Sequence, residues 1–108
     1  MDLSSLSELS ALSPVDGRYG SKSHALRAFF SEFGLIKHRV LVEVRWLQAL
    51  SAHDEITEVP VFTDSAKQVL NDIVDNFSLD DAQRIKDIES TTNHDVKAVE
   101  YFLKEKVS

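Results

Sequence analysis

Residues 35–52 have the sequence LIKHRVLVEVRWLQALSA and carry the clearest helical signal in the chain. Within this stretch the apolar residues Ile36, Val40, Val44 and Leu47 recur every three or four positions. That spacing brings them onto one face of an α-helix, where they can pack against a core. The stretch therefore predicts a long amphipathic helix.

The helical period continues on both sides of this stretch. It predicts a shorter helix over about 23–33, a helix after Thr63-Asp64, another after the capping-box pattern Ser78-Leu79-Asp80-Asp81, and a last helix that begins around Asn93. Residues 53–62 hold a proline and β-branched side chains, and they predict an extended connector. Strand alternation is absent, so the chain is predicted to be all-α with about five helices. Residues expected to pack are Leu26, Phe29, Phe30, Phe33, Trp46, Ala66, Val69, Leu70, Ile73, Val74, Phe77, Leu79, Ala82, Ile85, Ile88, Val96, Val99, Phe102, Leu103 and Val107.

The composition indicates one small globular domain. The chain has 108 residues, of which 43% are hydrophobic and 28% charged, and it has no cysteine. The lack of cysteine excludes disulfides and thiolate metal sites and fits a reducing compartment. No basic leader and no apolar run of transmembrane length is present, so neither a signal peptide nor a membrane span is expected. The four histidines lack the spacing of metal ligands, so no metal site is expected.

The charge is uneven along the chain. The net charge of −6 argues against nucleic-acid binding. Residues 18–45 nevertheless carry six basic and two acidic side chains, a net +4, which leaves −10 for the rest. A local positive region of this kind suits a small anionic ligand or an acidic partner surface. The alternative is a solvated helix face without a binding role.

The N-terminal part is predicted to be an arm and a turn, residues 1–22, that precede a helical domain over residues 23–108. Ser13-Pro14-Val15-Asp16-Gly17 has the composition of a turn, since proline fixes one dihedral angle and glycine tolerates positive φ. Arg18 and Tyr19 follow directly and can present a guanidinium fork and a hydroxyl to an anion. The alternative is a surface arginine beside a packed tyrosine.

The stretch Thr92-Asn93-His94-Asp95 allows two interpretations. Thr92 or Asn93 can cap the last helix, with Asp95 completing a capping box. Alternatively, His94 faces a ligand at the helix N-terminus, where unpaired N–H groups and the helix dipole favour an anion. Both can hold at once. The remaining histidines, His24, His38 and His53, are expected to be surface residues.

Two longer motifs carry a family resemblance. SPVDGRY (13–19) and TTNHDVKAVEY (91–101), with EVRWL (43–47) between them, resemble the N-terminal domain of bacterial adenylosuccinate lyases of the proteobacterial branch, in the fumarase/aspartase superfamily. The resemblance implies an all-α, homotetrameric, cytoplasmic enzyme of purine biosynthesis that needs no cofactor. It implies β-elimination of fumarate from succinyl-AMP, giving AMP, and from succinylaminoimidazole-carboxamide ribotide, giving aminoimidazole-carboxamide ribotide.

The resemblance also assigns substrate-binding residues. It implies that Arg18, Tyr19, Asn93, His94 and Asp95 contact the nucleotide substrate, with His94 as an orienting or auxiliary group. The principal general acid and the serine base of the family lie further along than this chain extends, so this chain alone is expected to be inactive and to be part of a longer protein. The alternatives are a non-catalytic helical interaction module that uses the basic region 18–45, or a regulatory domain that binds AMP by itself.

Overall fold

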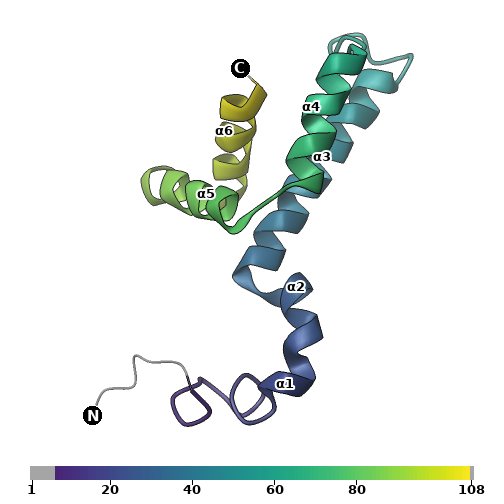
Figure 1. Cartoon of the computed structure of the whole chain (residues 1–108). Coiled ribbons are helices and arrows are strands. Elements are labelled where there is room, and N and C mark those ends of the chain that lie inside the picture. The colour runs from purple at the N-terminus through teal and green to yellow at the C-terminus, as the bar shows by residue number, and fades with distance from the viewer. Residues whose placement is uncertain (1–6, 108) are drawn as a thin grey trace. The chain divides into compact units, whose positions relative to one another are not determined.

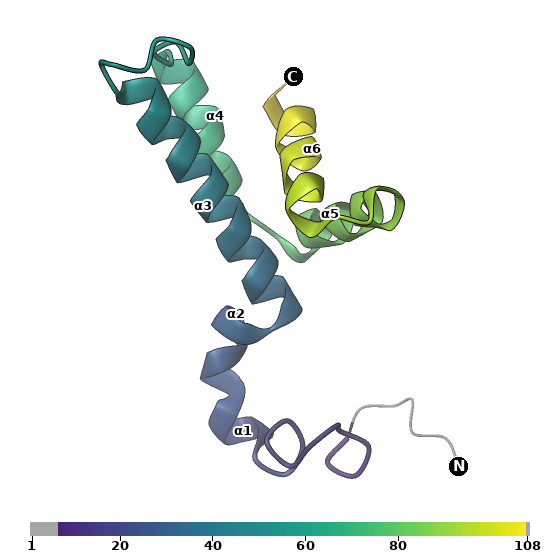
Figure 2. The same cartoon turned by 180° about the vertical axis from the view of Figure 1, so that it is seen from behind.

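The computed structural model describes residues 7–107, and every regular element in that range is a helix (Figures 1 and 2). The prediction of an all-α fold is therefore confirmed. The first six residues of the predicted arm lie outside the described range. The elements are α1 (Gly20–Ser23), a 3₁₀ turn η1 (His24–Leu26), α2 (Arg27–Phe30), α3 (Glu32–Ala52), α4 (Asp64–Asp75), α5 (Leu79–Thr92) and α6 (Asp95–Val107).

The chain forms two compact units, one up to Gly34 and one from Leu35 onward, and each is described by itself. The first unit extends past the predicted arm and contains α1, η1, α2 and the start of α3. Among residues 7–107 no helix is both long enough and apolar enough to cross a membrane.

The single helix predicted over about 23–33 is wrong in extent. The segment is divided into α1, η1 and α2, and Ser31 leaves the helical region with φ −68° and ψ 163°. The Ser31 hydroxyl accepts a hydrogen bond from the Gly34 N–H at 3.0 Å, so Ser31 caps the start of α3. Leu26, Phe29 and Phe30 are all exposed, because no described residue of this unit buries the face that they share.

Gly34 lies in the first turn of α3, where the chain runs very close to α2. A Cβ atom at this position would lie 2.6 Å from the Ala28 carbonyl oxygen and 2.8 Å from the Phe29 carbonyl carbon. Both contacts are to backbone, which cannot rotate away as a side chain can. The junction between α2 and α3 therefore needs glycine at this position.

The core of the second unit contains buried side chains from all four of its helices, α3, α4, α5 and α6. Ile36, Val40 and Val44 of α3 are buried, as the spacing in residues 35–52 predicts. Helices α3 and α4 run side by side in both views of the chain (Figures 1 and 2). Arg45 and Gln48 of α3 donate hydrogen bonds to the Asn71 side-chain oxygen of α4 at 2.7 and 3.1 Å. Polar contacts therefore join this helix pair as well as apolar burial.

Helices α5 and α6 pack directly against each other. They bury Ala82, Ile85 and Ile88 from α5 against Ala98, Val99 and Phe102 from α6. Phe102 also meets Phe77 edge-to-face, with ring centroids 6.0 Å apart. The predicted apolar faces are confirmed at these positions. They are wrong at Val69, Leu79, Val96, Val107 and Trp46, which are exposed because these residues lie on or beyond the margins of the packed faces.

The caps and the connector show how local sequence sets the helix boundaries. Thr63 accepts a hydrogen bond from the Ala66 N–H, and Ser78 and Asp81 form the predicted reciprocal capping box. The connector over 53–62 is held by Ser51, whose buried hydroxyl donates to the Pro60 carbonyl at 3.0 Å and accepts from the Phe62 N–H at 2.9 Å. The sequence does not predict this role of Ser51, because a serine inside a helix carries no signal of a distant partner.

Candidate functional site

The turn before the first helix forms as predicted. The Gly17 N–H donates to the Ser13 carbonyl at 2.9 Å, and the Tyr19 N–H donates to the Pro14 carbonyl at 2.8 Å. A Cβ atom on Gly17 would lie 2.9 Å from the Glu8 carbonyl oxygen, so the preceding chain packs tightly on the turn. These contacts fix the point at which Arg18 and Tyr19 leave the turn.

Two cations gather on the ring of Tyr19. The Arg18 guanidinium carbon lies 4.8 Å from the ring centroid, and the Lys22 Nζ lies 5.9 Å from it. Tyr19 is 45% exposed, so it is not the packed tyrosine of the alternative interpretation. Neither cation forms an ion pair with any residue from 7 to 107, which leaves both charges available to an anion. Lys22 belongs to the basic region 18–45, but no sequence motif assigns it to the site.

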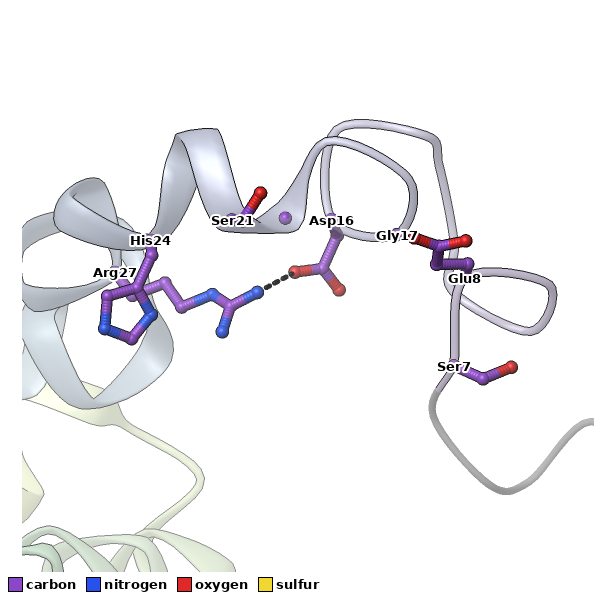
Figure 3. A pocket seen from close by; sticks show the side chains of 8 residues that line it. Ser7, Glu8, Asp16, Gly17, Ser21, His24 and Arg27 are labelled. Atoms are coloured by element: carbon purple, nitrogen blue, oxygen red, sulfur yellow. Dashed lines mark ion pairs between the residues drawn. The ribbon is translucent and has the colours of Figure 1, made fainter.

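A hollow of about 470 Å³ lies beside this turn (Figure 3). Its wall includes Asp16 and Arg27, whose side chains point toward each other with Oδ1 and Nη2 3.6 Å apart. His24 and Glu8 complete a wall of mixed charge. Arg18 and Tyr19 do not line this hollow, so the hollow and the candidate anion-binding residues are separate features of the first unit.

The second candidate region is the two-residue junction between α5 and α6. Asn93 has φ 53° and ψ 30°, in the left-handed region, and its N–H donates to the Glu89 carbonyl at 2.8 Å. Asn93 therefore ends α5, and the last helix begins at Asp95 rather than around Asn93. The reason is geometric: a junction this short needs one residue with positive φ, and asparagine tolerates that conformation better than most residues.

His94, and neither Thr92 nor Asn93, caps the last helix. Its carbonyl accepts the Ala98 N–H at 3.1 Å, and its Nδ1 accepts the Lys97 N–H at 3.1 Å. The Thr92 hydroxyl accepts from the His94 N–H at 3.3 Å and is 3.2 Å from the His94 carbonyl oxygen, to which it donates. Because Nδ1 accepts a hydrogen bond, the neutral ring carries its proton on Nε2. Nε2 has no partner among residues 7–107, so it is an available donor.

Asp95 is engaged at both carboxylate oxygens. Oδ1 accepts the Val96 N–H at 2.8 Å, and Oδ2 lies 3.3 Å from Nη2 of Arg39 on α3. A carboxylate in the first turn of a helix is also favoured by the helix dipole. The Arg39 guanidinium thus reaches from α3 to the first residue of α6.

The structure thus gathers Asn93, His94 and Asp95 into one exposed corner, with Arg39 behind it. Arg18 and Tyr19 belong to the other unit, and their meeting with His94 stays a prediction. His24, His38 and His53 are exposed, as expected. In the described part of the chain no three histidine or acidic side chains form a group that could hold a metal ion.

Comparison with known proteins shows that the chain is similar to adenylosuccinate lyases. The chain is 67% identical over 103 residues to the adenylosuccinate lyases of Vibrio cholerae and Escherichia coli K12, which covers 95% of this chain and 23% of each relative. It is 66% identical over 102 residues to the adenylosuccinate lyase of Haemophilus influenzae, covering 94% of this chain and 22% of the relative. The chain therefore spans less than a quarter of the length of these curated relatives.

A family model described as "Lyase" matches residues 17–108. The match begins at the glycine that closes the turn before Arg18, and it includes the whole junction between α5 and α6. It thus contains both candidate regions and most of the sequence, and on this ground the chain belongs to the lyase family.

Proposed function

We propose that this chain is the N-terminal, substrate-binding part of an adenylosuccinate lyase. The complete enzyme would release fumarate from succinyl-AMP to give AMP, and from succinylaminoimidazole-carboxamide ribotide to give aminoimidazole-carboxamide ribotide. The observation that carries the proposal is the identity of two residues in three over 95% of the chain with relatives of that name. We also propose, from the resemblance of the motifs, a homotetramer that acts in the cytoplasm without a cofactor.

The chemistry of the two exposed regions suits such a substrate. A succinylated nucleotide carries a phosphate and two carboxylates, which guanidinium, ammonium and N–H donors bind well. Arg18 and Lys22 supply unpaired cations beside the Tyr19 ring, and His94 supplies a neutral donor at Nε2. We assign substrate binding to Arg18, Tyr19, Asn93, His94 and Asp95, with Lys22 as an addition.

Asp95 needs a different role from its neighbours. A carboxylate repels an anionic substrate unless its charge is compensated, and the Arg39 guanidinium compensates it here. Asp95 can still accept a hydrogen bond from a substrate hydroxyl, since a carboxylate oxygen has more than one lone-pair site. We therefore propose that Asp95 recognises an uncharged donor of the substrate, such as a ribose hydroxyl, and not the phosphate.

The alternative of a helical interaction module has less support. It would use Arg39 and Arg45 to hold an acidic partner. Arg39 pairs with Asp95, and Arg45 donates to Gln48 and Asn71, so both guanidinium groups serve contacts within the chain. Two other cations of the basic region, Arg18 and Lys22, have no ion pair among residues 7–107 and lie beside Tyr19.

Turnover by the full-length polypeptide tests the proposal. Purified full-length protein should cleave succinyl-AMP, followed by the ultraviolet absorbance change that distinguishes it from AMP, while residues 1–108 alone should not. A folded full-length protein without turnover of either succinylated nucleotide would refute the proposal. Calorimetric titration of AMP into residues 1–108 should give no heat of binding, and saturable heat would favour a regulatory nucleotide-binding domain instead.

A further inference from the structure

We propose that Arg39 is a positioning residue that holds the Asp95 carboxylate and, through it, the exposed corner formed by Asn93, His94 and Asp95. The geometric part of this proposal stands on the contacts within the second unit. Its kinetic part rests on the proposed function, because it concerns binding of the anionic substrate.

The contact is specific in its geometry. Arg39 lies on α3 and Asp95 is the first residue of α6, so the pair joins two helices that are distant in the sequence. Nη2 of Arg39 lies 3.3 Å from Oδ2 of Asp95, while Oδ1 is already fixed by the Val96 N–H at 2.8 Å. With one oxygen held by the helix backbone and the other by a guanidinium, the carboxylate has a single orientation.

The surroundings keep the guanidinium in place. Arg39 lines a groove of about 390 Å³ together with Val42 of α3 and Val96 and Val99 of α6. Long arginine side chains commonly lay their methylene groups along such apolar walls while the charged end stays in water. The charged end of Arg39 is thereby presented to the first turn of α6, where Asp95 lies.

The Arg39–Asp95 pair is expected to contribute little to the stability of the fold. The side chains of Arg39 and Asp95 are 37% and 47% exposed, and exposed ion pairs contribute little to folding. The pair should matter more for the binding of an anionic ligand, because without Arg39 the corner beside His94 would present an uncompensated negative charge. Without Arg39 the Asp95 carboxylate would also be free to accept a hydrogen bond from Nε2 of His94, and it would then compete with substrate for that donor.

The test compares Arg39→Gln with a matched control, Arg84→Gln. Arg84 pairs with Glu105 across α5 and α6, with side chains 52% and 45% exposed, and it lies eight residues before α5 ends at Thr92. Amide hydrogen exchange is measured by NMR in residues 1–108. Arg39→Gln should speed exchange at the Val96 and Lys97 amides by about two- to fivefold, the range expected for loss of one exposed ion pair, and Asp95→Asn should do the same.

The control Arg84→Gln should leave those two amides unchanged. Unchanged exchange at Val96 and Lys97 in Arg39→Gln would overturn the proposal, whatever the enzyme activity. If Arg39→Gln proves unfolded, Asp95→Asn decides the question alone, because it removes the same contact from the other side.

Kinetics in the full-length protein give the second readout. Arg39→Gln should lower kcat/KM for succinyl-AMP by roughly tenfold, since small displacements of binding groups have effects of that order, and most of the loss should lie in KM. Arg39→Lys should restore part of it, and Arg84→Gln should behave as wild type. Arg39→Gln combined with Asp95→Asn should be no worse than Asp95→Asn alone; additive losses would overturn the proposal. A wild-type protein without turnover would refute the proposed function and leave the exchange result to decide the positioning role.

Discussion

The two nitrogens of His94 can be tested separately by substitution. His94→Ala removes both the Nδ1 acceptor that caps α6 and the Nε2 donor. His94→Asn keeps an acceptor at the cap position, where asparagine is among the preferred residues, but it removes Nε2 and leaves only the shorter-reaching amide Nδ2 as a donor. The pair of variants therefore separates the structural contribution of His94 from its contribution to substrate binding.

The structure sets the size of the expected effects. The cap is one backbone N–H bond at 3.1 Å on an exposed helix end, so His94→Ala should lower the free energy of unfolding by about 1 kcal/mol. His94→Asn should lie within about 0.5 kcal/mol of wild type, since it restores the cap. The measurement is urea unfolding of residues 1–108 followed by circular dichroism.

Turnover should rank these variants differently. In the full-length protein both His94→Ala and His94→Asn should lose kcat/KM by roughly a hundredfold or more, because loss of a preorganised donor at a reacting site has effects of that order. Equal stability of wild type and His94→Ala would refute the cap. Near-normal turnover by His94→Asn would refute the role of Nε2 in binding substrate.

Three further predictions concern the fold. Phe102→Ala should lower the free energy of unfolding by about 3–5 kcal/mol, because Phe102 is fully buried against Phe77. Phe30→Ala, at a 73% exposed position, should change the free energy of unfolding by less than about 0.5 kcal/mol. Urea unfolding measures both variants, and equal effects would contradict the packing. Gly34→Ala would set a Cβ atom 2.6 Å from a carbonyl oxygen of α2 and should cost about 1–3 kcal/mol in the same assay, and a stabilising effect would contradict that close approach. The hydrogen bond from Arg84 lowers the pKa of Glu105, so the stabilising effect of this contact is present at neutral pH and is lost as pH falls through the folded-state pKa. Glu105→Gln should therefore be less stable than wild type at neutral pH and equal to it in acid. A difference in stability that persists in acid would refute the linkage.

Local signals in the sequence predicted local structure well. The Thr63 cap and the Ser78 capping box depend on partners three residues away, and both formed as predicted. The spacing of Ile36 and Val40 predicted their burial, because a helix sets the relative direction of residues four apart. Where a residue and its partner are neighbours in the sequence, the local pattern is enough to predict their contact.

Features that depend on distant partners were not predictable in the same way. Trp46 and Phe30 are large and apolar, and their spacing gives them a helix face, but it cannot say what covers that face. The Arg39–Asp95 pair is another example, since its members lie 56 residues apart in the sequence and only the packing of α3 and α6 brings them together. The sequence therefore pointed to Asn93, His94 and Asp95, whose role in binding substrate stays a prediction, and it gave no sign of Arg39 beside them.

Capping and the proposed ligand binding are compatible at His94, because the cap uses Nδ1 and the proposed binding would use Nε2. While Nδ1 accepts the Lys97 N–H, the ring holds a single proton, on Nε2. Donating that proton to a leaving nitrogen would create an imidazolate, which is far too basic to form readily near neutral pH. Protonating Nδ1 to make a stronger acid would set two N–H groups against each other and break the cap. Under the proposed function, the contact that starts α6 therefore leaves Nε2 of His94 as a hydrogen-bond donor that orients substrate, and we assign the general acid to another part of the enzyme.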